Sequence, residues 1–223
     1  MRQFAFDFGL KAAYRRDDFI LSSSNEQAFS IIHSPELWLH NICLLNGVEG
    51  SGKTHLVHIW AKENDAKIIN AADLREDIIP DLFSHGAAVV EDIDKLISKQ
   101  GEVALFHITN MCLQLRDQLL LTSSLPLREL HFQLSDLRSR LSLAVPATIS
   151  PPDDELLDQI FWKLIADQQI EVPSNLSNFV LTRIERSVPA LQQAIHYINQ
   201  RAYGQKKPAM MVYAREYLQN ITP

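Results

Sequence analysis

Residues 47–54 read GVEGSGKT, which is the complete pattern GxxxxGKT of a phosphate-binding loop. The glycines at 47, 50 and 52 allow a tight turn whose backbone N–H groups point inward at phosphate oxygens. Lys53 supplies a cation for the outer phosphates, and the Thr54 hydroxyl is placed to ligate a Mg²⁺ ion that touches the same phosphates. The pattern therefore predicts a site for a nucleoside diphosphate or triphosphate with Mg²⁺.

The elements that must position this loop are a strand before it and a helix after it. The apolar run 42–45 predicts a buried strand, and residues 53–63 have the pattern of a helix. This context separates the motif from a chance glycine-rich turn. The nucleotide is expected to contact the loop and the residue after it: Gly47, Val48, Glu49, Gly50, Ser51, Gly52, Lys53, Thr54 and His55.

Apolar runs alternate with helical patterns through the first two thirds of the chain. Further strands are predicted at 67–70, 87–91, 119–123 and 145–149, with helices between them at 72–83, 102–116 and 135–143. This alternation predicts an α/β fold with a parallel sheet covered on both faces. Ligands of such sheets bind at the carboxyl ends of the strands, which is where the loop lies.

The run Pro-Pro-Asp-Asp at 151–154 ends the alternation and starts a helix. Three or four helical patterns follow, at 153–168, 174–186, 189–203 and 208–219, without a strand pattern. We therefore expect a nucleotide-binding α/β domain over 17–150 and a small all-helical domain over 151–223.

Composition limits the classes of partner. The net charge of -6 argues against a broad basic face that grips nucleic acid directly, so any route to DNA is expected to run through a partner. No apolar run approaches the ~20 residues that span a bilayer, and Asp7 lies where a signal peptide needs an apolar core. Cys43 and Cys112 each lie in an apolar stretch, which is typical of reduced core thiols. A soluble, cytoplasmic protein without membrane contact is expected.

Two acids stand at the end of the predicted strand 87–91: Glu91 is its last residue and Asp92 follows it. In nucleotidases with this loop, a carboxylate at such a strand end holds Mg²⁺ and its neighbour orients the attacking water. Thr54, Glu91 and Asp92 are therefore the expected metal-side residues. Without the loop, the two acids would be read equally well as a solvated strand end.

Hydroxyl groups and histidines near the loop allow two explanations each. Thr122, Ser123 and Ser124 end another apolar run, so their hydroxyls are expected at the same sheet edge, although turn capping explains any single one of them better. His55 and His58 have metal-ligand spacing but no third ligand nearby, so we expect packing or solvent contact.

Arg140 belongs to the segment LRSR at 137–140, on a predicted helix. It is either a member of a surface ion pair or an arginine finger that faces the nucleotide of a neighbouring subunit. The spacing of the residues does not choose between the two.

Taken in order, the segments GVEGSGKTH, AVVEDID, LLLTSS, LSDLRSRL and SPPDDELL resemble the ATPase core of the bacterial initiator DnaA, an AAA+ protein. The resemblance runs from about Asp18 to the C-terminus and implies an AAA+ P-loop domain followed by a helical lid domain. The chain is shorter than DnaA on both sides of this core and carries a short leader. That layout is similar to the regulatory members of the DnaA/Hda family.

The leader itself adds to the resemblance. Residues 3–8, QFAFDF, resemble the glutamine-led peptide with which such regulators dock onto the DNA polymerase sliding clamp. In an extended chain Phe4, Phe6 and Phe8 can enter an apolar groove while Gln3 makes a directed hydrogen bond. A buried edge strand has the same pattern. The resemblance implies that residues 1–16 form a clamp-binding tail.

Further roles are implied by the resemblance alone. Arg140 falls at the position of the family's arginine finger, and Ser124 would be a sensor-like residue of the nucleotide site. The finger would act in trans on ATP held by DnaA and leave the ADP form, which no longer initiates. The implied function is negative regulation of replication initiation, with the sliding clamp and DnaA as partners and DNA reached only through the clamp. The alternative is an AAA+ loader or DNA-recruitment adaptor that does not stimulate hydrolysis.

The chain departs from the family pattern at two positions. Glu91 stands where the family has an aspartate, and Pro189 falls near the family's nucleotide-sensing arginine, with Arg183 and Arg186 as the nearest cations. These changes predict weak intrinsic ATP turnover, with bound ADP or ATP fixing the angle between the two domains. The sequence leaves open whether the chain forms a homodimer.

Overall fold

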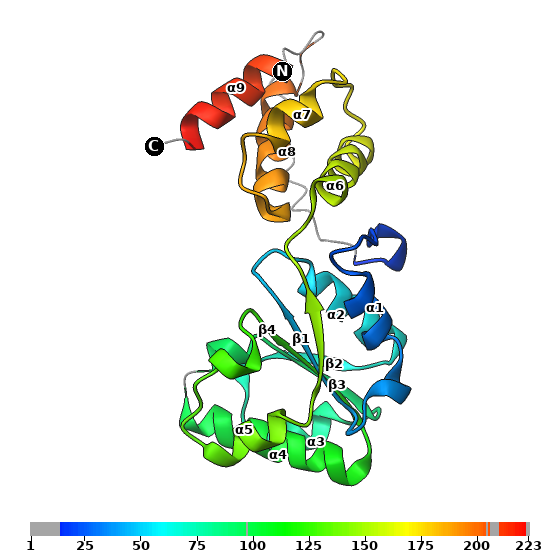
Figure 1. Cartoon of the computed structure of the whole chain (residues 1–223), viewed down its shortest axis with the longest axis vertical. Helices are drawn as coiled ribbons and strands as arrows, with labels where there is room; N and C mark the ends of the chain where they lie inside the picture. Colours follow the sequence, from blue (N-terminus) through cyan, green and yellow to red (C-terminus); the bar gives the residue numbers. More distant parts are fainter. Residues whose placement is uncertain (1–13, 97, 204, 206–209, 222–223) are drawn as a thin grey trace, which may run out of the picture.

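A computed structural model describes residues 14–96, 98–203, 205 and 210–221. The predicted clamp-binding residues Gln3, Phe4, Phe6 and Phe8 lie outside these ranges. An α/β part carries a helical part at one end, and Figure 1 shows the last strand of the sheet leading directly into the first helix of the helical part.

The sheet has five parallel strands, in the order β2-β3-β4-β1-β5. The strands are β1 (Ile42–Gly47), β2 (Lys67–Asn70), β3 (Ala87–Glu91), β4 (Gln118–Ser123) and β5 (Val145–Ile149). The central strands β3, β4 and β1 are almost entirely buried, which is why the sequence shows them as continuous apolar runs. The predicted α/β fold with a parallel sheet is confirmed.

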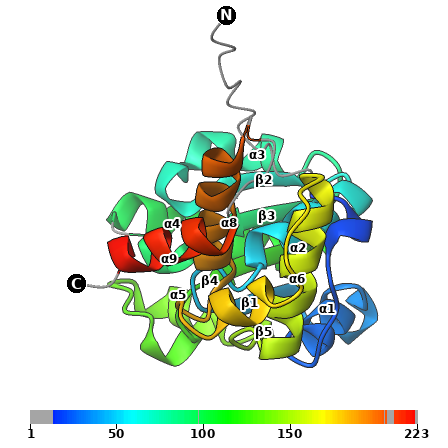
Figure 2. The ribbon, with the colours of Figure 1, turned by 90° about the horizontal axis from the view of Figure 1, so that it is seen from above.

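Helices cover both faces of the sheet. They are α1 (Glu26–Ile32), α2 (Lys53–Glu63), α3 (Ile79–Leu82), α4 (Lys99–Leu115) and α5 (Ser135–Leu141). In Figure 2, α1 and α2 lie on one side of the strands and α4 and α5 on the other. Each side has its own buried core, with Trp38 stacked on Trp60 at 5.5 Å between ring centroids on the α1–α2 side.

The helical part contains α6 (Asp154–Asp167), α7 (Leu176–Leu181), α8 (Val188–Ala202) and α9 (Met210–Ile221). It has a separate hydrophobic core that includes Phe161, Leu191 and Ile195. The α/β part passes into the helical part within a few residues. Strand β5 ends at Ile149, and Asp153 caps α6 by accepting a hydrogen bond from the Leu156 N–H at 2.7 Å. The part of the chain described after Ile149 contains no strand, as the sequence predicted.

One predicted helix is wrong. Residues 72–83 form two 3₁₀ turns, η3 (Ala71–Asp73) and η4 (Glu76–Ile78), and then the four-residue α3. Leu74 and Arg75 have extended backbone angles between the turns. Pro80 lacks an N–H and so belongs at the start of a helix, where α3 places it, rather than in a helix interior.

Smaller differences occur elsewhere. The predicted helix 174–186 is confined to α7, and α1 was not predicted. The remaining 3₁₀ turns are η1 (Arg16–Asp18), η2 (Pro35–Leu37), η5 (Ile93–Lys95) and η6 (Leu127–Glu129). None of the helices described is long and apolar enough to cross a membrane.

Candidate nucleotide site

The phosphate-binding loop joins the carboxyl end of β1 to the amino end of α2. Gly50 and Gly52 have φ angles of +73° and +100°, which only glycine adopts at little cost. Gly52 caps α2, an 11-residue helix, so the positive end of its dipole opens onto the loop. Gly47 has no room for a side chain, because a Cβ there would lie 2.6 Å from Ser51 Oγ and 2.9 Å from the Ile149 carbonyl oxygen.

Lys53 points its ammonium group back across the loop. Its Nζ donates to the carbonyl oxygens of Gly47 at 2.6 Å and Val48 at 3.1 Å, and the residue is only 7% exposed. Burial lowers the pKa of Lys53, and the carboxylates of Asp92 and Asp94 act in the opposite direction. An ammonium group has three donors, so one remains for a phosphate oxygen.

Two buried polar atoms beside the loop also fit a polar ligand. Ser51 Oγ and Asn46 Oδ1 are both buried and have no hydrogen-bond partner within the described part of the chain. Buried polar groups are nearly always paired, so unpaired atoms next to a glycine-rich turn indicate a place where a ligand supplies the partner. Together with Lys53 and the start of α2, they fit the phosphates of a nucleotide.

Glu91 and Asp92 differ in how they are held at the end of β3. The Asp92 carboxylate accepts hydrogen bonds from Lys95 Nζ at 3.0 Å and from Asn70 Nδ2 at 3.4 Å. Glu91 is half-buried and its carboxylate makes no hydrogen bond or ion pair to any residue that the structure describes. Glu91 is thus the freer of the two predicted metal-side carboxylates.

No group of three or more His, Cys, Asp or Glu side chains could hold a metal ion by itself within the described ranges. Mg²⁺ in nucleotide sites is usually bound by one or two protein ligands together with phosphate oxygens and water. The predicted residues Thr54 and Glu91 fit that pattern. They would hold the ion only together with the nucleotide.

The three hydroxyl residues at the end of β4 are not equivalent: Thr122 and Ser123 are its last two residues, and Ser124 follows it. Thr122 Oγ1 accepts a hydrogen bond from the Asp92 N–H at 2.9 Å, and Ser123 Oγ bonds to the N–H and the carbonyl of Leu125. Turn capping therefore accounts for Ser123, whereas Thr122 binds the chain that leaves the neighbouring strand β3. The Ser124 N–H donates to Asp94 Oδ1 at 3.0 Å, and its hydroxyl has no partner within the described chain.

An aromatic cluster lies along the first turns of α2. Tyr14 contacts the rings of His55 and His58, with centroids 5.4 Å and 4.1 Å away, and the Phe19 ring lies 5.3 Å from that of His55. Phe19 also lies beside Gly52, at 3.7 Å from the position of a Cβ there. Burial lowers the pKa of His55. Both histidines thus pack against aromatic rings, one of the two alternatives expected from the sequence.

The helical part touches the loop through Pro189. A Cβ on Gly50 would lie 2.5 Å from both Cδ and Cγ of the Pro189 ring, so the two residues are in close contact. The two arginines that precede Pro189 in the sequence make other contacts. Arg183 donates to the Phe179 carbonyl at 3.0 Å and stacks on the Phe179 ring, and Arg186 pairs with Asp154.

Arg140 lies away from these residues. It is the sixth residue of α5, which is anchored by the fully buried Leu137 and Leu141. The chain then enters β5 at Val145, the amino end of the sheet and the end opposite the phosphate-binding loop. The Arg140 side chain is exposed and has no hydrogen bond or ion pair to any described residue.

A buried carboxylate fixes the start of α5. Glu102 of α4 is 3% exposed and accepts hydrogen bonds from the N–H groups of Gln133 at 3.1 Å and Leu134 at 2.8 Å. Leu134 is the N-cap residue of α5 and has no capping side chain of its own. Glu102 therefore holds the chain that leads into the helix of Arg140.

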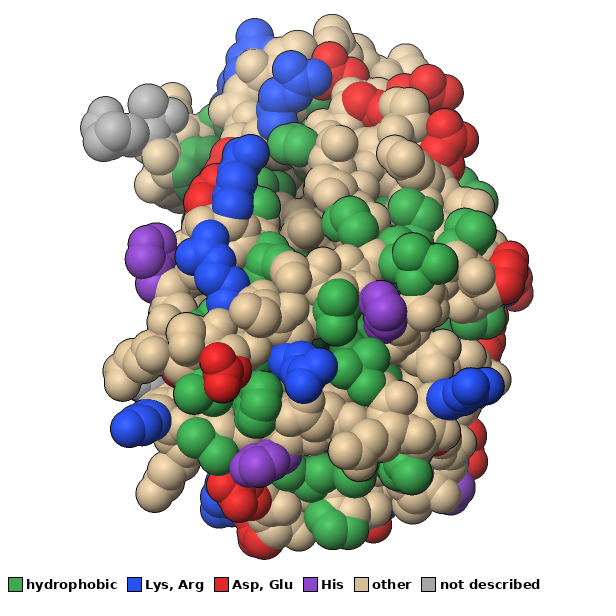
Figure 3. All heavy atoms as spheres, turned by 60° about the horizontal axis from the view of Figure 1, so that its bottom comes forward, with side chains coloured by type: hydrophobic (Ala, Val, Ile, Leu, Met, Phe, Trp, Pro, Cys, Tyr) green, Lys and Arg blue, Asp and Glu red, His purple; other side chains and the backbone are tan. Residues whose placement is uncertain are grey.

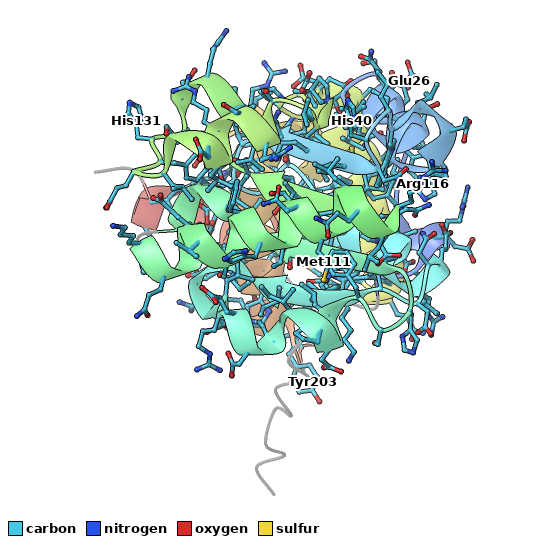
Figure 4. All side chains as sticks on the ribbon, turned by 90° about the horizontal axis from the view of Figure 1, so that it is seen from below. Glu26, His40, Met111, Arg116, His131 and Tyr203 are labelled. Atoms are coloured by element: carbon cyan, nitrogen blue, oxygen red, sulfur yellow. The ribbon has the colours of Figure 1, made fainter. Side chains whose placement is uncertain are left out.

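The surface at this end of the sheet combines apolar and basic side chains. Leu39 is 85% exposed just before β1, and Leu115 is 60% exposed at the end of α4. Figure 3 shows hydrophobic side chains gathered on the lower face with separate Lys and Arg side chains around them. Figure 4 looks at the same end from below and labels His40 and Arg116 on it.

No family model matches the chain. It is 28% identical over 210 residues to the chromosomal replication initiator protein DnaA of Borreliella afzelii, covering 83% of this chain and 43% of that protein. It is 25% identical over 238 residues to DnaA of Cutibacterium acnes, covering 96% of this chain and 47% of that protein. The chain thus spans less than half of the length of these relatives.

Solved structures give the fold. Domain III of Thermotoga maritima DnaA superposes with a TM-score of 0.77 at 19% identity, over 93% of this chain and 98% of that one. The chain thus has the fold of DnaA domain III. AMPPCP-bound DnaA from Aquifex aeolicus gives a TM-score of 0.75 at 20% identity, over 96% of this chain and 72% of that one. In sequence and in fold the chain is DnaA-like.

The DnaA-like core brings most of the predicted nucleotide residues together. Lys53, Glu91, Asp92 and Ser124 all come from the carboxyl edge of the sheet or from the loop that leaves it, whereas Arg140 lies elsewhere. Five residues around the site were not predicted from the sequence: Tyr14, Phe19, Asp94, Lys95 and Glu102. Asp94 could have been predicted from the sequence, because it is a third acid at the end of the strand after Glu91 and Asp92. The other four depend on contacts between distant segments or on turn geometry.

Proposed function

We propose that the protein is a nucleotide-holding regulator of DNA replication initiation that docks on the DNA polymerase sliding clamp and stimulates hydrolysis of ATP bound to DnaA. The nucleotide, ADP or ATP with Mg²⁺, lies in the phosphate-binding loop. Lys53, the unpaired Ser51 Oγ and the start of α2 support this half of the proposal. Structural relatives support it too, since one is AMPPCP-bound DnaA and another is DnaA bound to AMPPCP and single-stranded DNA.

The free guanidinium group of Arg140 carries the regulatory half of the proposal. A guanidinium contributed across an interface stabilises charge on a transferred phosphoryl group and accelerates hydrolysis by ~10³ to 10⁵. Arg140 is exposed, lacks a partner within the described chain and lies at the end of the sheet opposite its own loop. Its target is therefore a nucleotide held by another molecule, and the DnaA resemblance makes DnaA that molecule.

The protein's own nucleotide turns over slowly in this proposal. Glu91 replaces the aspartate expected of the family, the Asp92 carboxylate is bound to Lys95 and Asn70, and Pro189 faces the loop. The bound nucleotide then supports the arrangement of the two parts of the chain. A turnover assay on the purified protein alone tests this, and turnover at the rate of an efficient ATPase would contradict it.

Clamp docking rests on the leader sequence. Gln3 and the three phenylalanines at 4, 6 and 8 have the spacing of a peptide that enters an apolar groove. A chain of net charge -6 lacks the charge balance of a protein that binds DNA directly, so the clamp would bring it to DNA in the cytoplasm. Deletion of residues 1–8 is expected to abolish clamp binding while the core stays folded.

The test is a reconstituted hydrolysis assay with ATP-bound DnaA, clamp loaded on DNA, and the wild-type protein or a variant. Arg140→Ala is expected to bind the clamp normally and to lose stimulation of phosphate release. Arg138→Ala is the matched control, because Arg138 lies on the same helix but bonds to the Arg128 carbonyl at 3.3 Å. Undiminished stimulation by Arg140→Ala would exclude it as the finger. Partner binding without stimulation by the wild type would favour the loader or adaptor role.

A further inference from the structure

The contact between the helical part and the phosphate-binding loop is apolar. Gly50 is the fourth residue of the loop, and its positive φ turns the space of a missing side chain toward the Pro189 ring. The 2.5 Å separation between a Cβ at this position and two ring carbons means that only glycine accepts the ring. The helical part therefore docks on the loop by shape.

The start of α8, which brings Pro189 to the loop, offers few hydrogen-bond donors. Pro189 has no N–H group. The N–H of the next residue, Ala190, is taken by the Ser187 side chain at 3.3 Å. The N–H of Leu191 bonds to the Ser187 carbonyl at 3.2 Å. The first turn of α8 therefore lacks a cluster of free N–H groups that could surround a phosphate.

The helical part also offers no free cation within the described ranges. Each of its described Lys and Arg side chains contacts a carboxylate or an aromatic ring: Lys163, Arg183, Arg186, Arg201 and Arg215. Lys53 remains for the outer phosphates, and the acids Asp92, Asp94 and Glu49 lie in its electrostatic surroundings. A third phosphate would add negative charge that the helical part does not neutralise.

We infer that the helical part does not distinguish a nucleoside triphosphate from a diphosphate, and that Pro189 is the residue responsible. This inference rests on the proposed nucleotide site and extends it to the choice between ADP and ATP. The Pro189 ring closes on Gly50 whether two or three phosphates fill the loop, so ATP gains no affinity over ADP from the helical part.

The experiment measures the dissociation constants of ADP and ATP, both with Mg²⁺, by titration calorimetry. For the wild type we expect the two constants to agree within about threefold. Pro189→Arg places a guanidinium at the loop, where a charge-assisted hydrogen bond to the third phosphate is expected to favour ATP by about tenfold or more. Gln193→Arg adds the same charge one turn further along α8, on an exposed position, and is expected to keep the wild-type ratio.

The outcomes separate the inference from the proposed function. Wild-type protein whose two constants differ by more than about threefold, in either direction, would overturn the inference and leave the nucleotide site intact. An unchanged ratio in a folded Pro189→Arg variant would also overturn it. Wild-type protein that binds neither nucleotide would overturn the proposed site and the inference with it. The wild-type ratio decides the matter even if Pro189→Arg does not fold.

Discussion

Glu102→Gln should destabilise the protein and loosen the segment that leads into α5. The carboxylate accepts two backbone N–H groups, at 3.1 Å and 2.8 Å, in a site where the residue is 3% exposed. A hydrogen bond to a charged group contributes about 1.5–3 kcal/mol, and a buried donor left without a partner costs about 1–3 kcal/mol. The side-chain oxygen of a glutamine can still accept one of the two hydrogen bonds. Its NH₂ group cannot accept the other, so the second backbone N–H is left without a partner. We therefore expect a loss of about 2–4 kcal/mol in the free energy of unfolding.

Urea unfolding of the two proteins checks this value, and the midpoint should fall while the m-value stays unchanged. Glu129→Gln is the control, because Glu129 is 49% exposed and pairs only with the exposed Arg128, an interaction worth about 0–1 kcal/mol. Hydrogen exchange at the Gln133 and Leu134 amides should rise in Glu102→Gln alone. A loss below about 0.5 kcal/mol, or unchanged exchange at these amides, would refute the role of Glu102 as the anchor of this segment.

Three further predictions concern the nucleotide site and the titrating groups. Lys53→Ala should weaken nucleotide binding at least ~100-fold in a calorimetric titration, because it removes the ammonium group from the loop; affinity close to wild type would exclude Lys53 from the site. Burial raises the pKa of Cys43 and of Cys112 to about 12, so both thiols should resist a thiol reagent at pH 8 in the folded protein and react once it is unfolded. Their contribution to stability is present below the ordinary thiol pKa of 9.0 and is lost as the pH rises toward 12. The hydrogen bond from Lys163 lowers the pKa of Asp18, so its contribution is present above the ordinary value of 3.8 and is lost as the pH falls through the lowered pKa. Asp18→Asn should remove that part of the acid dependence, worth at most about 1 kcal/mol, in unfolding curves recorded from pH 6 to pH 2.

The sheet was predictable because its strands are buried on both faces. Residues 87–90 read AAVV and residues 119–121 read LLL, and such runs between polar residues are typical of parallel strands. The helix that follows the loop was predictable from the loop motif itself. The predicted helix at 72–83 was wrong, because it rested on an apolar pattern although Pro80 disfavours a helix interior at that position.

The phosphate-binding loop was predictable because its geometry is local. Its residues are contiguous, and the positive φ angles at Gly50 and Gly52 follow from the glycines of the motif. The contacts that complete the site are not local. Pro189 contacts Gly50 although the two residues are far apart in the sequence. Tyr14, which precedes α1, contacts the ring of His58 in α2. The resemblance marked position 189, but only the fold brings it to the loop.

The strand β5 connects the two ends of the sheet. Arg140 lies in α5, five residues before Val145, which pairs with Cys43, and Ile149 at the other end of the strand lies against Gly47 of the loop. Five residues of strand separate these ends by about 13 Å, and beyond Ile149 the chain passes into α6. A nucleotide bound at the loop could change the position of Arg140 through β5 only if β5 moved within the sheet. Such a movement is disfavoured, because β5 pairs with β1 along its whole length. We therefore expect bound nucleotide to stabilise the arrangement in which Arg140 is presented, whether it is ADP or ATP, rather than to switch it on and off.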